Sequence, residues 1–159
     1  MGETNEIVKN ASLSTWDYIS PEFEIIYPDL FFPNMIIEDP NNYYWPYLRS
    51  EIPHSWYVDR QEPFVGFLNR HEAHILYNTA LKFAGKKALE IGCWRGWSAC
   101  HMALAGVELD VIDPVLAKED VYESVTSSLR PASVLDSVNL VDGYSPQKVE
   151  ELAKQLQRK

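Results

Sequence analysis

The fold of this chain is predicted from one run of sequence, Ala88-Leu89-Glu90-Ile91-Gly92-Cys93-Trp94-Arg95-Gly96-Trp97-Ser98-Ala99. Its beginning belongs to a short apolar strand, Lys87–Ile91, that leads directly into a glycine-containing turn. A glycine at this point lets the chain turn sharply and brings the backbone close to a ligand. The spacing then predicts a helix from Ser98 to Ala105, which ends at Gly106. The free N–H groups at the start of this helix face the turn. Two glycines in a strand-to-helix turn are, by themselves, typical of an ordinary turn.

The sequence on both sides of this run repeats the alternation of helix and strand. A helix is predicted over residues 72–81, ahead of the first strand. After it the sequence predicts a strand at 107–112, a helix at 118–129, a strand at 137–141 and a last helix after Ser145-Pro146. Consecutive strand–helix–strand units form a parallel sheet with right-handed crossovers. The predicted fold class is therefore α/β, with a Rossmann-like parallel sheet in residues 67–159.

Residues 1–66 have a different composition and are predicted to form a separate extension or cap. Between Trp16 and Phe67 lie 14 of the 20 aromatic residues and seven of the ten prolines. Prolines at this density exclude long helices and central strands, whereas the aromatic content is untypical of disorder. We expect an ordered, irregular, Pro- and aromatic-rich segment. Aromatic packing alone is favoured over a role as a substrate lid.

Composition limits the partners and the compartment that we expect. The net charge of -9 argues against nucleic-acid binding and against an anionic membrane. No apolar run approaches the roughly 18 residues of a membrane span, and the acidic first residues do not resemble a signal peptide. Two cysteines, Cys93 and Cys100, are typical of a reducing compartment. We therefore expect a cytoplasmic protein.

Acidic residues follow or end the predicted strands, where a nucleoside would bind. Glu90 precedes Gly92 by two residues, and its carboxylate would repel a pyrophosphate but suits a ligand that carries an ammonium and a sulfonium. Asp113 ends the second strand, 21 residues after Gly92, where it can accept hydrogen bonds from ribose hydroxyls. The third strand leads into residues 142–145, a polar and aromatic segment suited to an adenine ring.

From Arg70 to Ser145 the sequence resembles the class I S-adenosylmethionine-dependent methyltransferases, especially the small-molecule O-methyltransferases. The residues that carry the resemblance are Leu89-Glu90-Ile91-Gly92, Gly96-Trp97-Ser98, Val111-Ile112-Asp113-Pro114 and Asp142-Gly143-Tyr144-Ser145. The resemblance implies that Glu90, Gly92, Gly96 and Ser98 frame the methionine end of the cofactor, that Asp113 holds the ribose, and that residues 142–145 hold the adenine.

The predicted activity is methyl transfer from S-adenosylmethionine to an oxygen or nitrogen of a small molecule. No catalytic base and no metal site can be assigned. The alternative is a catalytically inactive methyltransferase-like binding module, or a fragment that needs a partner chain. The complete set of residues expected to bind the cofactor is Glu90, Gly92, Cys93, Trp94, Gly96, Trp97, Ser98, Asp113, Asp142, Gly143, Tyr144 and Ser145.

Some residues depart from related patterns. A dinucleotide-binding turn needs glycine where Trp94 and Trp97 stand, which argues against NAD. The two tryptophans would face the sulfonium, because aromatic rings attract cations by roughly 0.5–2 kcal/mol, but we favour a packing role for Trp97. Cys93 and Arg95 are expected to contribute backbone only. The spacing of His71 and His74, three apart with no third ligand, favours a solvated helix start over a zinc site.

The resemblance also implies that part of the fold lies outside this sequence. Class I methyltransferases have about seven strands in the order 3-2-1-4-5-7-6, and this sequence reaches Lys159 after its third strand–helix unit. Residues 88–91 would then present an unpaired apolar edge. Either the N-terminal extension covers this edge, or a second copy pairs with it in a homo-oligomer, or the chain is truncated. We favour truncation.

Overall fold

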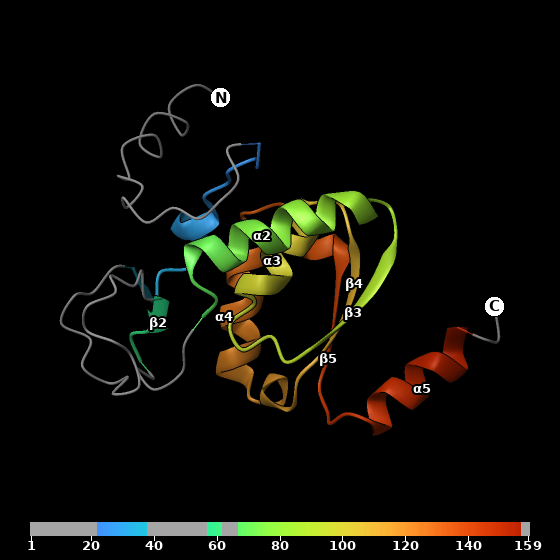
Figure 1. Cartoon of the computed structure of the whole chain (residues 1–159). Coiled ribbons are helices and arrows are strands. Elements are labelled where there is room, and N and C mark those ends of the chain that lie inside the picture. Colours follow the sequence, from blue (N-terminus) through green and yellow to red (C-terminus); the bar gives the residue numbers. More distant parts are fainter. Residues whose placement is uncertain (1–21, 38–56, 62–66, 157–159) are drawn as a thin grey trace, which may run out of the picture. The chain divides into compact units, whose positions relative to one another are not determined.

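In a computed structural model, residues 22–37, 57–61 and 67–156 of the protein are described (Figure 1). They fall into two units, divided between Ile75 and Leu76. The sequence places its composition change earlier, between residues 66 and 67, so the division in the structure lies inside a helix. The elements are η1 (Pro28–Phe31), β1 (Met35–Ile37), β2 (Tyr57–Asp59), α2 (Arg70–Ala80), η2 (Leu81–Phe83), β3 (Lys87–Ile91), α3 (Trp97–Leu104), β4 (Glu108–Ile112), η3 (Pro114–Ala117), α4 (Glu119–Leu129), η4 (Leu135–Ser137), β5 (Val138–Val141) and α5 (Gln147–Leu156).

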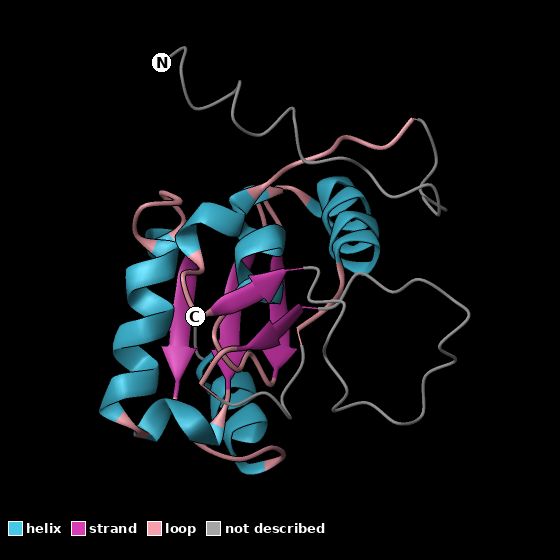
Figure 2. Ribbon diagram, turned by 90° about the vertical axis from the view of Figure 1, so that its left-hand side faces the viewer, coloured by secondary structure: helices cyan, strands magenta, loops and turns pink. Residues whose placement is uncertain are grey.

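The second unit is built on a three-stranded parallel sheet with the order β3-β4-β5 (Figure 2). Helix α3 connects β3 to β4, and α4 lies between β4 and β5 in the chain. Each predicted strand and helix of this region is present, within a few residues of its expected ends. The α/β, Rossmann-like fold class is therefore confirmed.

Alternating side chains explain how the sheet buries one face. Leu109 and Val111 of β4 are 3% and 0% exposed, and α3 contacts this strand. In β3, Leu89 and Ile91 lie on either side of Glu90 in the strand and are 44% and 60% exposed. Successive side chains of a strand point to opposite faces, so the helices protect one face of β3 more completely than the other.

Strand β3 forms an edge of this sheet within the described parts of the chain. Its only strand neighbour there is β4, and two of its exposed side chains, Leu89 and Ile91, are apolar. For these residues the predicted unpaired apolar edge is confirmed. The amphipathic helix α5 extends away from the sheet in Figure 1.

The first unit contains short elements, as its prolines require. β1 and β2 pair antiparallel over three residues each. Helix α2 begins with a reciprocal cap, in which Glu72 N–H donates to Asn69 Oδ1 at 2.9 Å and Asn69 N–H donates to Glu72 Oε2 at 2.8 Å. The aromatic run at residues 42–47 lies outside the described residues, so its packing stays a prediction.

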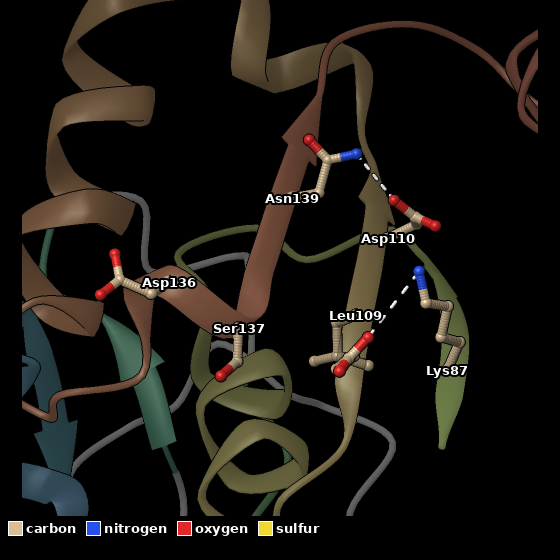
Figure 3. Close-up of a pocket in the computed structure, with 7 residues that line it drawn as sticks. Lys87, Leu109, Asp110, Asp136, Ser137 and Asn139 are labelled. Atoms are coloured by element: carbon tan, nitrogen blue, oxygen red, sulfur yellow. Dashed lines mark hydrogen bonds and ion pairs between the residues drawn. The ribbon is translucent and has the colours of Figure 1, made fainter. Parts of the chain in front are cut away.

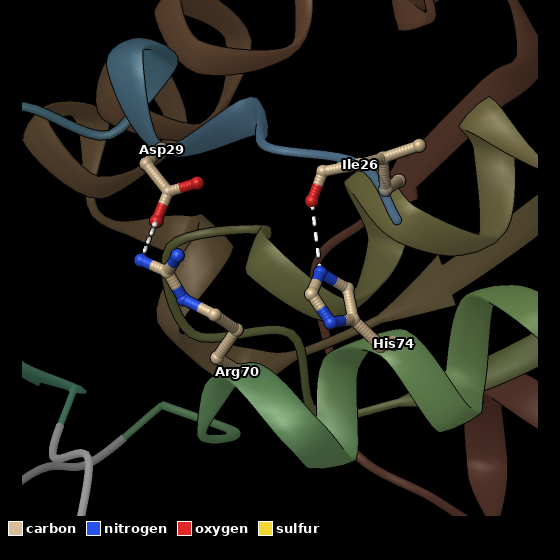
Figure 4. A network of polar contacts seen from close by, with 4 residues as sticks. All are labelled: Ile26, Asp29, Arg70 and His74. Carbon is tan, nitrogen blue, oxygen red and sulfur yellow. Dashed lines mark hydrogen bonds and ion pairs between the residues drawn. The ribbon is translucent and has the colours of Figure 1, made fainter. Parts of the chain in front are cut away.

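The residues around the start of α2 form a polar cluster inside the first unit (Figure 4). Arg70 Nη2 lies 3.5 Å from Asp29 Oδ1, and its guanidinium stacks 5.0 Å from the centre of the Tyr27 ring. His74 Nε2 lies 2.9 Å from the carbonyl oxygen of Ile26, and burial lowers the pKa of this imidazole. His74 is buried rather than solvated, because the segment around Ile26 covers it; the expectation of a solvated histidine was wrong.

The described ranges contain no group of three histidine, cysteine or acidic residues arranged to hold a metal ion. None of the helices described has the length and apolar character needed to cross a lipid bilayer.

Candidate functional site

The carboxyl ends of the three parallel strands meet at one edge of the sheet. Strand register places Ile91, Ile112 and Val141 side by side. The ladder continues one step further, since Gly92 N–H donates to the Ile112 carbonyl at 2.8 Å and Asp113 N–H donates to the Val141 carbonyl at 3.1 Å. The structure thus brings the predicted glycine turn and the predicted acidic residue together, as the motif order requires.

Asp113 anchors the turn that follows β3. Its Oδ2 accepts hydrogen bonds from the backbone N–H of Cys93 at 2.8 Å and of Trp94 at 3.0 Å, and its Oδ1 accepts from Val115 N–H at 3.0 Å. The side chain is buried, with 6% of its surface exposed. This role was not predicted from the sequence, although Asp113-Pro114 carries the signature of a helix cap followed by a first-turn proline. Contact between Asp113 and a ribose stays a prediction.

Glu90 and Ser98 lie together at the start of the turn and of helix α3. The Ser98 hydroxyl donates a hydrogen bond to Glu90 Oε1. Glu90 Oε2 is closed off from solvent and has no hydrogen-bond partner among the residues described. Burial raises the pKa of Glu90 to about 7, the Ser98 hydrogen bond opposes that rise, and the nearby Asp113 carboxylate adds to it.

The two glycines of the turn have different surroundings. Gly92 and Gly96 both have positive φ, at +84° and +86°, which only glycine adopts without strain. A Cβ added to Gly92 would meet nothing within 4 Å, so the turn leaves open space there. A Cβ added to Gly96 would lie 3.0 Å from Cγ1 of Val125 in α4. The open space for a ligand therefore lies at Gly92, whereas the absence of a side chain at Gly96 lets α3 approach α4.

The tryptophans of the turn also differ. Trp97 is 3% exposed, and its ring lies 4.3 Å from that of His101 in a T-shaped arrangement, which agrees with the favoured packing role. Trp94 is half-buried and has a φ of +46°. The guanidinium of Arg95 lies 4.7 Å from the centre of the Trp94 ring. The side chain of Arg95 is buried and stacks on its neighbour. That Arg95 contributes only backbone to a cofactor site stays a prediction.

The cysteine of the turn is held through its backbone, and its contribution to a cofactor site stays a prediction. Cys93 N–H is one of the groups that Asp113 holds, and the side chain is buried. Burial raises the pKa of the Cys93 thiol strongly, and the carboxylates of Asp113 and Glu90 raise it further. The thiol is therefore protonated and a poor nucleophile at neutral pH.

The predicted adenine segment follows β5 at the same edge, but it is open to solvent. Asp142 and Ser145 are exposed, and Tyr144 is 71% exposed. Gly143 has a φ of +138°, and an added Cβ would lie only 2.5 Å from Cγ of Lys148. The segment is thus close to the other strand ends without enclosing a ring; adenine binding by these four residues stays a prediction.

A hollow of about 160 Å³ lies at the opposite end of the strands (Figure 3). In it, Lys87 Nζ lies 3.7 Å from Glu108 Oε2, and Asn139 Nδ2 donates to Asp110 Oδ1 at 2.7 Å. These polar groups satisfy one another, and the hollow does not include the glycine turn. Parallel α/β sheets bind ligands beyond the carboxyl ends of their strands, so we place the candidate site at Glu90, Gly92 and Asp113.

Comparisons with known proteins give likenesses to solved structures. No family model and no curated protein sequence matches the chain. Among solved structures, the chain is similar to the SAH-bound methyltransferase PaMTH1 of Podospora anserina, with a TM-score of 0.46 and 19% sequence identity. The match covers 54% of this chain and 37% of that protein, so the chain spans well under half the length of this neighbour.

Proposed function

We propose that the chain supplies the S-adenosylmethionine-binding portion of a methyltransferase that acts on an oxygen or nitrogen of a small molecule. The observation that supports this most directly is the buried carboxyl of Glu90 beside an open glycine turn. A buried carboxyl with one oxygen that lacks a partner attracts a cationic ligand and repels a phosphate. A mononucleotide or dinucleotide is a poor match for this turn, whereas a sulfonium that also carries an ammonium fits it.

The residues of the turn would hold such a cofactor in distinct ways. Glu90 would accept from the ammonium, the exposed backbone at Gly92 would lie against the methionine portion, and Asp113 would keep the turn in shape. S-adenosylmethionine, when bound, supplies an activated methyl group. The chain's contribution would then be alignment, since holding donor and acceptor near ~3 Å in line accounts for much of such catalysis.

One observation favours the second candidate, a binding module without catalysis. The β3 edge carries exposed apolar side chains, Leu89 and Ile91, and an unpaired edge of this kind is suited to pairing with another chain. Binding of S-adenosylmethionine without turnover would fit both candidates, whereas turnover by the chain would exclude this one.

The decisive test compares two glycines by calorimetric titration with S-adenosylmethionine and S-adenosylhomocysteine. Gly92→Val should abolish binding, because the side chain fills the open space at the turn. Gly85→Val is the matched control: Gly85 also has positive φ, at +72°, and an added Cβ meets nothing within 4 Å, but it precedes β3 and lies outside the turn. Equal affinities for wild type and both variants, or no binding by the wild type, would refute the proposal.

Asp113→Ala should also abolish binding, through a different cause. The substitution removes the acceptor for two backbone N–H groups of the turn, so the turn itself should lose its shape. Circular dichroism and a thermal melt would verify that the variant keeps its fold before its affinity is interpreted.

A further inference from the structure

Two carboxyl groups stand on neighbouring strand ends with opposite surroundings. Asp113 accepts three backbone hydrogen bonds, two from the turn and one from Val115. Glu90 accepts one, from the Ser98 hydroxyl, and its second oxygen is buried with no partner in the described part of the chain. Backbone N–H groups stabilise the ionised form of a carboxyl. Burial with a single hydrogen-bond donor therefore favours the protonated form of Glu90.

The titratable groups around Glu90 reinforce this difference. Asp113, after the end of β4, faces Glu90. Burial raises the pKa of Glu90 most, and the charge of Asp113 raises it further. The Cys93 thiol faces it from the turn and is itself kept protonated by burial and by both carboxylates. Ser98 faces it from α3 as a neutral donor. With a pKa of about 7, the Glu90 carboxyl is close to half protonated at neutral pH.

We propose that a ligand with an ammonium group binds at the glycine turn by displacing the proton of Glu90, so that ligand binding and proton release are coupled at this site. This inference rests on the proposed function and adds how the site is regulated. In the step, the neutral carboxyl loses its proton to the solvent, and the carboxylate accepts a hydrogen bond from the ligand ammonium. One proton leaves and one cation enters, so the buried pair ends without net charge.

The coupling sets a direction for the pH dependence. Below about pH 7 most Glu90 side chains carry the proton that must leave, so affinity should fall as pH falls, towards tenfold for each pH unit. Well above pH 7 the carboxyl is already ionised, and affinity should no longer depend on pH. A ligand without an ammonium does not need the carboxylate and should not release a proton.

The experiment is calorimetric titration of the full chain with S-adenosylhomocysteine, at about pH 6 and about pH 8.5, in two buffers of different ionisation enthalpy. The dependence of the heat on the buffer gives the number of protons released. We expect close to one proton for each ligand at the lower pH and close to none at the higher pH. The nucleoside methylthioadenosine, which has no ammonium, should release none at either pH.

Glu90→Gln is the matched variant, since it keeps the shape of the side chain without the titration. Its binding of S-adenosylhomocysteine should be weaker and independent of pH, with no proton released. If the wild type binds without releasing a proton, or Glu90→Gln releases the same proton, this inference is overturned while the proposed function stands. If the ligand does not bind at any pH, both are overturned.

Discussion

Replacing Glu90 with glutamine should change how the stability of the fold depends on pH. Burial raises the pKa of this carboxyl from its ordinary 4.5 to about 7 in the folded chain. Because the folded state then binds the proton more tightly than the unfolded state, its stabilising contribution is present below about pH 4.5 and is lost as pH rises towards 7. A pKa difference of about 2.5, at about 1.4 kcal/mol for each unit, amounts to about 3 kcal/mol of unfolding free energy.

Urea unfolding followed by circular dichroism measures this effect. Most of this difference, about 2–3 kcal/mol, falls between pH 5 and pH 8, so the wild type should lose roughly that much stability relative to Glu90→Gln over this interval. Comparing the two proteins at both pH values cancels any packing cost of the substitution that does not depend on pH.

Glu108→Gln serves as the control. Glu108 lies on the neighbouring strand, its side chain is 61% exposed, and its ion pair with Lys87 has a distance of 3.7 Å. Its removal should change the pH dependence by less than about 0.5 kcal/mol. If wild type and Glu90→Gln lose stability in parallel from pH 5 to pH 8, Glu90 ionises normally in the folded chain, and the basis for proton-coupled binding is gone.

Two further predictions concern the same part of the fold. Gly96→Ala should lower the free energy of unfolding, measured in urea, by about 2–4 kcal/mol, because strain at positive φ adds to a close contact with fully buried Val125. In the control Gly85→Ala the added Cβ meets open space, so the loss should be only about 1–2 kcal/mol. Equal losses in the two variants would contradict this account of Gly96. The thiols of Cys93 and Cys100 should react with an aromatic disulfide reagent at pH 8 at least about 100-fold more slowly in the folded chain than in urea. The reason is that burial raises the pKa of both thiols, that of Cys100 to about 12. Rapid modification of the folded chain would show that the turn opens readily.

The sequence predicted the parallel sheet because its signals are local. The apolar strand at Lys87–Ile91 is found with the bounds that its composition predicts, and Glu108–Ile112 differs by one residue from its expected start. Glycine and proline mark where these elements end. The meeting of Glu90, Gly92 and Asp113 follows from topology alone, since parallel strands place their carboxyl ends together.

The sequence could not predict what the side chains at that edge contact. An acid at a strand end looks the same whether it faces a ligand or the chain's own N–H groups, and Asp113 does the second in the structure. The stacking of Arg95 on Trp94 and the positive φ of this tryptophan are features that no residue preference indicates. The exposure of Tyr144 depends on which segments lie over it, and that information is not local.

The hold of Asp113 on the turn has a consequence for how this protein can vary. One carboxylate joins two segments that are 20 positions apart in the chain, through hydrogen bonds to main-chain groups that every residue except proline possesses. The side chains at Cys93 and Trp94 can therefore be substituted as long as Asp113 is retained, but substitution of Asp113 requires a new conformation of the whole turn. Among divergent descendants, the shape of this loop and the identity of residue 113 should be inherited together.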